Sequence, residues 1–162
     1  MKKKLLVSVA VLGWLPTLAV VTGARWLTGV PVLGQGHTPI KITRIFTGPD
    51  GKTKLEEYEV PLKARDRGTD LSEAVAVTSV QFRRTTQEYS LDWHTAPRRQ
   101  FVITLAGESE IELEGGRRVR LGPGNILLAE DTTGQGHISR AVAGKERVSL
   151  TLPLADGAQV PR

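Results

Sequence analysis

Short runs of alternating apolar and polar residues cover most of the chain after Ile40. The runs at 41–47 and 54–60 flank Gly48-Pro49-Asp50-Gly51, a tetrapeptide rich in turn-forming residues, and they predict a β-hairpin. Further strand-like runs follow at 74–82, 101–107, 110–114, 117–121, 125–129, 137–142 and 147–152, with a polar loop at 61–70. Because turn residues separate these runs and no long helical periodicity interrupts them, the pattern predicts an all-β sandwich or barrel.

The run at 110–114 shows which of its faces is polar. Glu110, Glu112 and Glu114 share one parity, and Ile111 and Leu113 share the other. Successive side chains of a strand point to opposite faces, so we expect the aliphatic residues to face the core. The glutamates are then interpreted as a solvated strand face.

The first 24 residues have the pattern of a targeting segment. Lysines occupy positions 2–4, an apolar run covers 5–15, Pro16 ends that run, and Thr22-Gly23-Ala24 offers a small-residue cleavage site. This pattern predicts a cleaved signal peptide at 1–24 and an exported protein, periplasmic or secreted. The alternative is an uncleaved membrane anchor at 5–24, since a span of about 20 uncharged residues matches a bilayer core.

Composition divides the remainder into three parts. Residues 25–39 are rich in glycine and proline and are expected to form a linker. The strand-like runs predict a single β domain at 40–155, followed by a short C-terminal tail at 156–162. The chain has 162 residues and no cysteine, which excludes disulfides, thiolate metal sites and a cysteine nucleophile.

The basic character of the chain lies partly in the predicted leader. The formal net charge is +5, with 22 basic and 17 acidic residues; without lysines 2–4 the balance is 19 to 17, or +2. The pairs Arg83-Arg84, Arg98-Arg99 and Arg117-Arg118 are scattered among acidic residues and do not form a stripe with interleaved aromatic residues. We therefore expect no nucleic-acid partner.

Two histidines mark the candidate chemistry. His94 precedes the run at 101–107, and His137 follows Gly134-Gln135-Gly136. Their surroundings resemble the cupin superfamily, whose first motif is G-x5-H-x-H-x3,4-E-x6-G and whose second motif ends in P-x-G-x2-H. His94 matches the first histidine, Gln100 stands at the glutamate, and His137 is the final histidine.

The resemblance covers residues 75–153 and includes Gly107 of the first motif and the turn Leu121-Gly122-Pro123-Gly124-Asn125 before the second. It implies a small, single-domain jelly-roll barrel, which is a double-stranded β-helix. Barrels of this kind often pair through edge strands, so the resemblance also leaves a homodimer open.

The metal-binding part of the cupin motif is incomplete in this chain. Ala96 replaces the second histidine, and the neutral amide of Gln100 replaces a carboxylate. The resemblance therefore leaves three candidate ligands for a divalent Fe, Mn, Zn or Cu ion: His94, His137 and Gln100. The side chains that could complete the set are Asp92, Glu130, Asp131 and His37. No cofactor follows with certainty from the sequence.

Arg98 is the candidate for binding an anion. It shares the parity of His94 and Gln100, so strict alternation predicts that it faces the cavity and clamps a carboxylate. The alternatives are that Pro97 breaks this parity, or that Arg98 and Arg99 are solvated or paired with acids. The predicted ligand-binding residues are His94, Gln100, His137 and Arg98.

Three functions of different kinds remain open. The leading expectation is an exported cupin-like protein that binds a small organic molecule, anionic if Arg98 contributes, inside the barrel. The second is a metal-dependent enzyme of the dioxygenase or isomerase type with an atypical two-histidine ligand set. The third is a structural or assembly module without catalysis. Whether the protein is an enzyme is open at this point, because one fold hosts many unrelated sites.

Overall fold

A computed structural model describes residues 38–142 and 144–162, and strands dominate this part of the chain. The strands are β1 Lys41–Thr47, β2 Thr53–Glu59, β3 Lys63–Ala64, β4 Asp70–Leu71, β5 Gln81–Thr85, β6 Ser90–His94, β7 Gln100–Ala106, β8 Ser109–Glu112, β9 Arg118–Leu121, β10 Ile126–Glu130, β11 His137–Ala141 and β12 Arg147–Pro153. The helical elements of the described residues are two short 3₁₀ turns, Asp66–Gly68 and Glu114–Gly116. The expectation of an all-β fold is confirmed.

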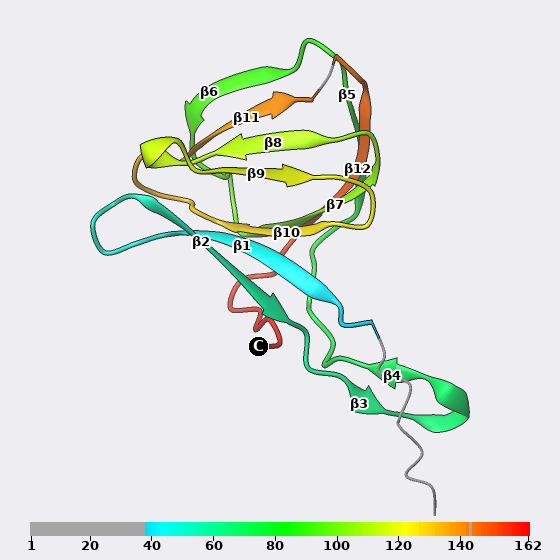
Figure 1. The fold of residues 1–162 in the computed structure, drawn as a ribbon. Coiled ribbons are helices and arrows are strands. Elements are labelled where there is room, and N and C mark those ends of the chain that lie inside the picture. Colours follow the sequence, from blue (N-terminus) through cyan, green and yellow to red (C-terminus); the bar gives the residue numbers. More distant parts are fainter. Residues whose placement is uncertain (1–37, 143) are drawn as a thin grey trace, which may run out of the picture. The chain divides into compact units, whose positions relative to one another are not determined.

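The strands form two main sheets. The six-stranded sheet has the order β2-β1-β10-β7-β12-β5, the four-stranded sheet has the order β6-β11-β8-β9, and β3 with β4 makes a separate ribbon. Figure 1 shows the two main sheets facing each other. Buried side chains from both sheets meet between them, so the space between the sheets holds the core.

Eight consecutive strands pair in a nested order. β8 pairs with β9, β7 with β10, β6 with β11 and β5 with β12, and all four pairings are antiparallel. A long hairpin folded across two sheets gives this arrangement, because its two arms stay paired along their whole length. The nesting places β6 and β11, which carry His94 and His137, side by side.

The predicted first hairpin is confirmed. β1 and β2 are antiparallel, with pairs from Lys41 opposite Glu59 to Thr47 opposite Thr53. Gly51 in the connecting turn has φ +73°, a value that glycine adopts without steric penalty. β1 also runs parallel to β10, so the hairpin joins the edge of the nested strands.

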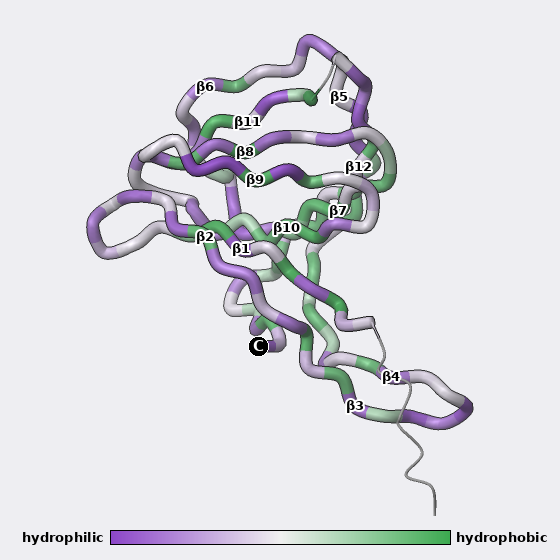
Figure 2. Tube along the Cα trace, viewed as in Figure 1, coloured by the Kyte–Doolittle hydropathy of each residue, from purple (hydrophilic) through white to green (hydrophobic). Residues whose placement is uncertain are grey.

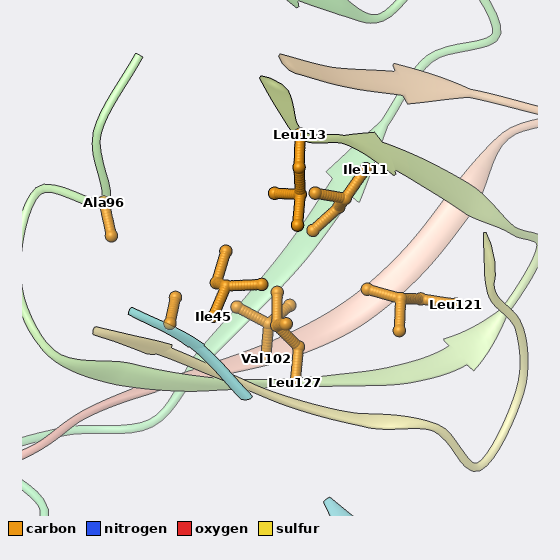
Figure 3. Close-up of a cluster of buried hydrophobic side chains, with 8 residues drawn as sticks. Ile45, Ala96, Val102, Ile111, Leu113, Leu121 and Leu127 are labelled. Atoms are coloured by element: carbon orange, nitrogen blue, oxygen red, sulfur yellow. The ribbon is translucent and has the colours of Figure 1, made fainter. Parts of the chain in front are cut away.

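An inner apolar cluster fills much of the space between the sheets. Figure 3 shows Ile111 and Leu113 on one side converging with Ile45, Val102 and Leu127 on the other. Burial of each such side chain contributes about 1.5–3 kcal/mol. This cluster is therefore the main apolar contact that holds the two sheets together.

The faces predicted for 110–114 are confirmed around β8. Ile111 and Leu113 are each 3% exposed. Glu110 and Glu112 lie on the opposite face, where Glu112 pairs with Arg118 at 3.1 Å. Figure 2 shows the resulting mixture of hydrophilic and hydrophobic positions along β8 and β9.

A second apolar cluster covers the outer face of the six-stranded sheet. Ile42 and Leu128 pack there with Leu154 and Ala158. The segment 156–162, expected as a tail, thus includes one buried residue, and the terminal Arg162 pairs with Glu130 at 3.1 Å. The C-terminal segment is consequently part of the packing of the domain.

Two local expectations are wrong. Residues 74–80 were expected to be strand, but β5 begins at Gln81, and the preceding residues contribute the isolated bridge of Val77 to Leu154. Their β-branched composition favours extended backbone without supplying a partner strand. The expected loop at 61–70 instead contains the β3–β4 pairing, with Lys63 opposite Leu71.

The predicted leader at 1–24 and the linker positions up to 37 lie outside the described residues. Linker positions 38 and 39 are exposed and have no regular structure. Within the described part of the chain, no helix has the length and apolar character required to cross a bilayer.

Candidate functional site

A cavity of about 370 Å³ lies between the two main sheets. This volume is at the small end of the range for ligand pockets, which is about 300–1,000 Å³. Apolar side chains of the inner cluster form part of its wall. The polar residues of its lining are Gln81, Arg83, Tyr89, His94, Gln100, Ser109, Ser139, His137, Arg147 and Thr151.

His94 and His137 meet in the wall of this cavity. They are directly opposite each other in the β6–β11 pairing, and their ring centroids are 4.4 Å apart with an interplanar angle of 53°. His137 is 6% exposed, whereas His94 is half-buried. The two motif histidines, 43 positions apart in the sequence, therefore form one imidazole pair.

Hydrogen bonds determine which nitrogen of each ring carries a proton. His137 Nδ1 lies 2.6 Å from Asp131 Oδ2, and His94 Nδ1 lies 2.7 Å from the backbone oxygen of Asp92. An ionised carboxylate and a carbonyl oxygen can only accept, so each Nδ1 donates. In the neutral state, Nε2 of each ring keeps a lone pair that can accept a proton or a ligand's hydrogen bond.

Asp131 is a fully buried carboxylate behind His137. Its side chain is 0% exposed, and Oδ2 accepts a second hydrogen bond from Thr53 Oγ1 at 3.3 Å. Oδ1 has no hydrogen-bond partner among the described residues. Losing the hydrogen bond to His137 would leave this buried carboxylate poorly satisfied, so the bond holds the His137 ring in one orientation.

The two glycines that precede His137 allow close contacts between backbone segments. Gly136 has φ +77°, and a Cβ placed there would lie 2.0 Å from the backbone oxygen of His94. Gly134 has φ +76°, and its Cβ would lie 2.2 Å from the backbone oxygen of Gly51. Both positions therefore require glycine for conformation and for space.

The structure places Gln100 in the cavity wall and Arg98 outside it. Gln100 lines the cavity together with both histidines, and Ala96 is buried at the cavity wall, 4% exposed. Arg98 is exposed and is not part of the lining. Residues 97–99 form a bend before β7, so the alternation that would turn Arg98 inward is interrupted at Pro97.

The carboxylates named as further metal ligands have other partners. Glu130 forms 2.5 Å ion pairs with Arg44 and Arg99. The side chain of Asp92 accepts a hydrogen bond from the Trp93 backbone at 2.9 Å, and Asp131 holds His137 Nδ1. His37, the other candidate, lies outside the described residues.

The described residues do not fit a resident divalent metal. They contain no group of three or more His, Cys, Asp and Glu side chains that could hold a metal ion. His94, His137 and the amide of Gln100 supply two nitrogen donors and one weak oxygen donor, whereas catalytic metal sites use about three strong protein ligands. Among the described residues, the chemistry that the cavity wall offers is therefore hydrogen bonding and charge.

Arg147 is a cavity residue that the sequence analysis did not single out. It is 6% exposed, and its Nε and Nη2 donate to Thr104 Oγ1 at 3.3 and 3.1 Å. It forms no ion pair with any residue in the described parts of the chain. Burial lowers the pKa of its guanidinium, and the nearby charge of Arg83 lowers this pKa further. A buried cation without a counterion is expensive, so Arg147 is suited to an anionic ligand.

Hydroxyl groups line the same cavity as Arg147. Ser109 Oγ and Thr151 Oγ1 belong to cavity-lining residues, are buried, and have no hydrogen-bond partner among the residues described. Tyr89 Oη and Ser139 Oγ lie 3.0 Å apart in the same wall. A buried hydroxyl without a partner costs about 1–3 kcal/mol, which a ligand that bonds to it can recover.

The inward face of β12 explains why Arg147 was not recognised. Arg147, Ser149 and Thr151 are buried, while Val148 and Leu150 on the other face are half-buried. Alternation in 147–152 indicates two faces but not which of them points inward. The one available signal was this row of polar side chains at every second position.

No protein-family model matches the chain, and no curated protein matches it significantly.

Proposed function

We propose that this protein binds a small anionic organic molecule in the cavity between its two main sheets. The observation that carries the proposal is Arg147, a buried guanidinium in the cavity wall without an acidic partner among the described residues. The lining contains two arginines and two histidines and no Asp or Glu. A ligand with one or two negative charges complements this wall electrostatically.

The cupin-like jelly roll is part of the same proposal. Its support is the nested pairing of β5 to β12 and the meeting of His94 with His137, the two positions that carry the motif resemblance. Jelly rolls are sandwiches of two antiparallel sheets with eight strands in this order. The leader pattern at 1–24 supports export, to the periplasm or the outside of the cell.

A thermal-shift screen of small organic acids tests the binding proposal. The purified full-length chain is heated with each acid and with a neutral analogue of similar size, and the same compounds are tested on Arg147→Met and Arg98→Met. A ligand that binds only the folded state raises the melting temperature. We expect at least one acid to stabilise the wild type and Arg98→Met but not Arg147→Met. The proposal fails if no acid stabilises the wild type or if Arg147→Met responds equally.

Self-association is a second candidate role, favoured by the outer face of β5. β5 ends the six-stranded sheet, and Phe82 on this strand is 84% exposed. Edge strands and large exposed apolar side chains are features that a second copy can cover. Light scattering of the full-length chain and of Phe82→Ser tests this role: we expect a dimer that the substitution converts to a monomer, and a monomeric wild type would exclude it.

A further inference from the structure

The two ends of the cavity offer different chemistry. Gln100, at the start of β7, lines the cavity together with both histidines, and Thr104, four residues further along β7, accepts hydrogen bonds from Arg147. Four residues of strand cover roughly 13 Å, so the guanidinium bonded to Thr104 lies about that far along β7 from Gln100. The cavity therefore has an imidazole end and a guanidinium end, separated by a space that suits a molecule of monosaccharide size.

Neutral oxygen-bonding groups also line the cavity. Ser109 and Thr151 present hydroxyls without partners among the described residues, and Ser139 shares its hydroxyl with Tyr89. Apolar side chains, including Ile111, form the rest of the wall. A ligand that bears several hydroxyls at its edges and C–H groups on its faces would satisfy both kinds of surface, because unfilled buried hydroxyls and unfilled apolar contacts are each costly.

We infer that the ligand is a polyhydroxylated monocarboxylate, that is, a sugar acid of about one monosaccharide unit. This inference rests on the proposed anion-binding function and adds the nature of the rest of the molecule. The carboxylate pairs with Arg147, and the hydroxyls bond to Ser109, Thr151 and the Nε2 atoms of His94 and His137. A monocarboxylate fits because Arg147 is the buried one of the two arginines in the lining, whereas nearby Arg83 is half-buried.

Calorimetric titration of the full-length chain tests each part of the inference. The sugar acids are glucuronate, galacturonate, mannuronate and gluconate. Cyclohexanecarboxylate keeps the carboxylate on a six-membered ring without hydroxyls, glucose keeps the hydroxyls without the charge, and glucose 6-phosphate replaces the carboxylate by a phosphate. We expect at least one sugar acid to bind at least ten times more tightly than all three of these probes.

Single substitutions test which side chains contact the sugar acid. Arg147→Met is expected to abolish binding of the sugar acid, and Ser109→Ala and Thr151→Val to weaken it about tenfold each, as loss of one hydrogen bond in a buried site does. Arg98→Met is the matched control, because Arg98 is exposed and outside the lining, and it is expected to bind like the wild type.

Three other outcomes of the titrations would each contradict a specific claim about the ligand. If cyclohexanecarboxylate binds as tightly as the sugar acids and Arg147→Met abolishes its binding, the sugar-acid inference is wrong and the anion-binding function stands. If glucose 6-phosphate binds more tightly, the carboxylate assignment is wrong. If glucose binds as tightly and Arg147→Met has no effect, both the inference and the proposed function fail.

Discussion

His94 and His137 lie opposite each other on β6 and β11, with ring centroids 4.4 Å apart, but their rings are anchored differently. His137 is held by the fully buried carboxylate of Asp131, whereas half-buried His94 donates to a backbone oxygen. We expect His137→Ala to lower the free energy of unfolding by about 3 kcal/mol, because it leaves a buried carboxylate with one weak partner. His94→Ala is expected to lower it by about 1 kcal/mol. Urea denaturation at pH 7 measures both changes.

A double-mutant cycle separates this pairing from simple loss of packing. Removing Asp131 as well as His137 eliminates the unpaired buried charge, so the double variant should be less destabilised than the sum of the two single variants, with a coupling energy of about 1–3 kcal/mol. Strict additivity would mean that the 2.6 Å contact contributes little to stability.

The close approach of Gly136 to the backbone of His94 gives a separate prediction. Gly136→Ala adds both the strain of φ +77° and a clash with the His94 backbone oxygen, so we expect a loss of more than about 2 kcal/mol. Gly124→Ala is the matched control: it has φ +84° but nothing within 4 Å of the added Cβ, and the conformational penalty alone is about 1 kcal/mol. Equal losses in the two variants would contradict the close approach at Gly136.

Sequence patterns predicted the strands best where a turn and a polar face coincide. The hairpin around Gly51 and the inward position of Ile111 followed from turn residues and alternation, and both are confirmed. The segment 74–80 was assigned to a strand because its composition suits extended backbone, but strand assignment requires a neighbour, and the neighbour is set by the tertiary fold.

The site was predictable only in part, for a related reason. Motif spacing identified His94 and His137, and these residues do meet. Alternation failed at Arg98, because the bend at 97–99 resets the parity of the chain. Arg147 was missed because the alternation in β12 indicates two faces but does not show that the polar face points into the cavity. Which face is inside depends on the opposite sheet, and that relationship is not a local property.

Glu130 links the stability of the outer sheet face to pH. Burial alone would raise the pKa of its carboxyl group, but hydrogen bonds from Arg44 and Arg99 outweigh this effect and hold the pKa below the usual value. A carboxyl group with a lowered folded-state pKa stabilises the protein above its unfolded pKa, which is about 4.3, and this contribution is lost as the pH falls through the folded-state value. The wild type should therefore lose stability as the pH falls below about 4.3.

Glu130→Gln tests this linkage. We expect a loss of about 3 kcal/mol at pH 7, since the substitution leaves arginines around a neutral amide, and a flatter stability profile below pH 5. Glu59→Gln, at an exposed position of β2, is the control and should change stability by less than about 0.5 kcal/mol. Parallel pH profiles for the wild type and Glu130→Gln in urea denaturation would rule out Glu130 as the titrating group.

Metal content provides an independent prediction. Because the described residues supply His94, His137 and the amide of Gln100 but no third strong donor, we expect well below one divalent ion for each chain. Elemental mass spectrometry of the full-length chain, purified without a histidine tag and before any chelator, measures this directly. Near-stoichiometric iron, manganese, zinc or copper that disappears in both His94→Ala and His137→Ala would overturn this prediction and restore the metal-dependent alternative.

Arg147 should oppose folding while it serves binding. Burial lowers the pKa of its guanidinium, which means that the folded environment disfavours the charged form that prevails at neutral pH. We expect Arg147→Met to increase the free energy of unfolding of the ligand-free protein by about 1–2 kcal/mol, although Thr104 loses its bonded partner. Arg147→Lys keeps a buried charge and should give no such gain. Urea denaturation without ligand distinguishes the three proteins. A less stable Arg147→Met would show that the guanidinium supports the fold, whereas a more stable one that no longer binds acids is the trade-off expected of a residue retained for its ligand.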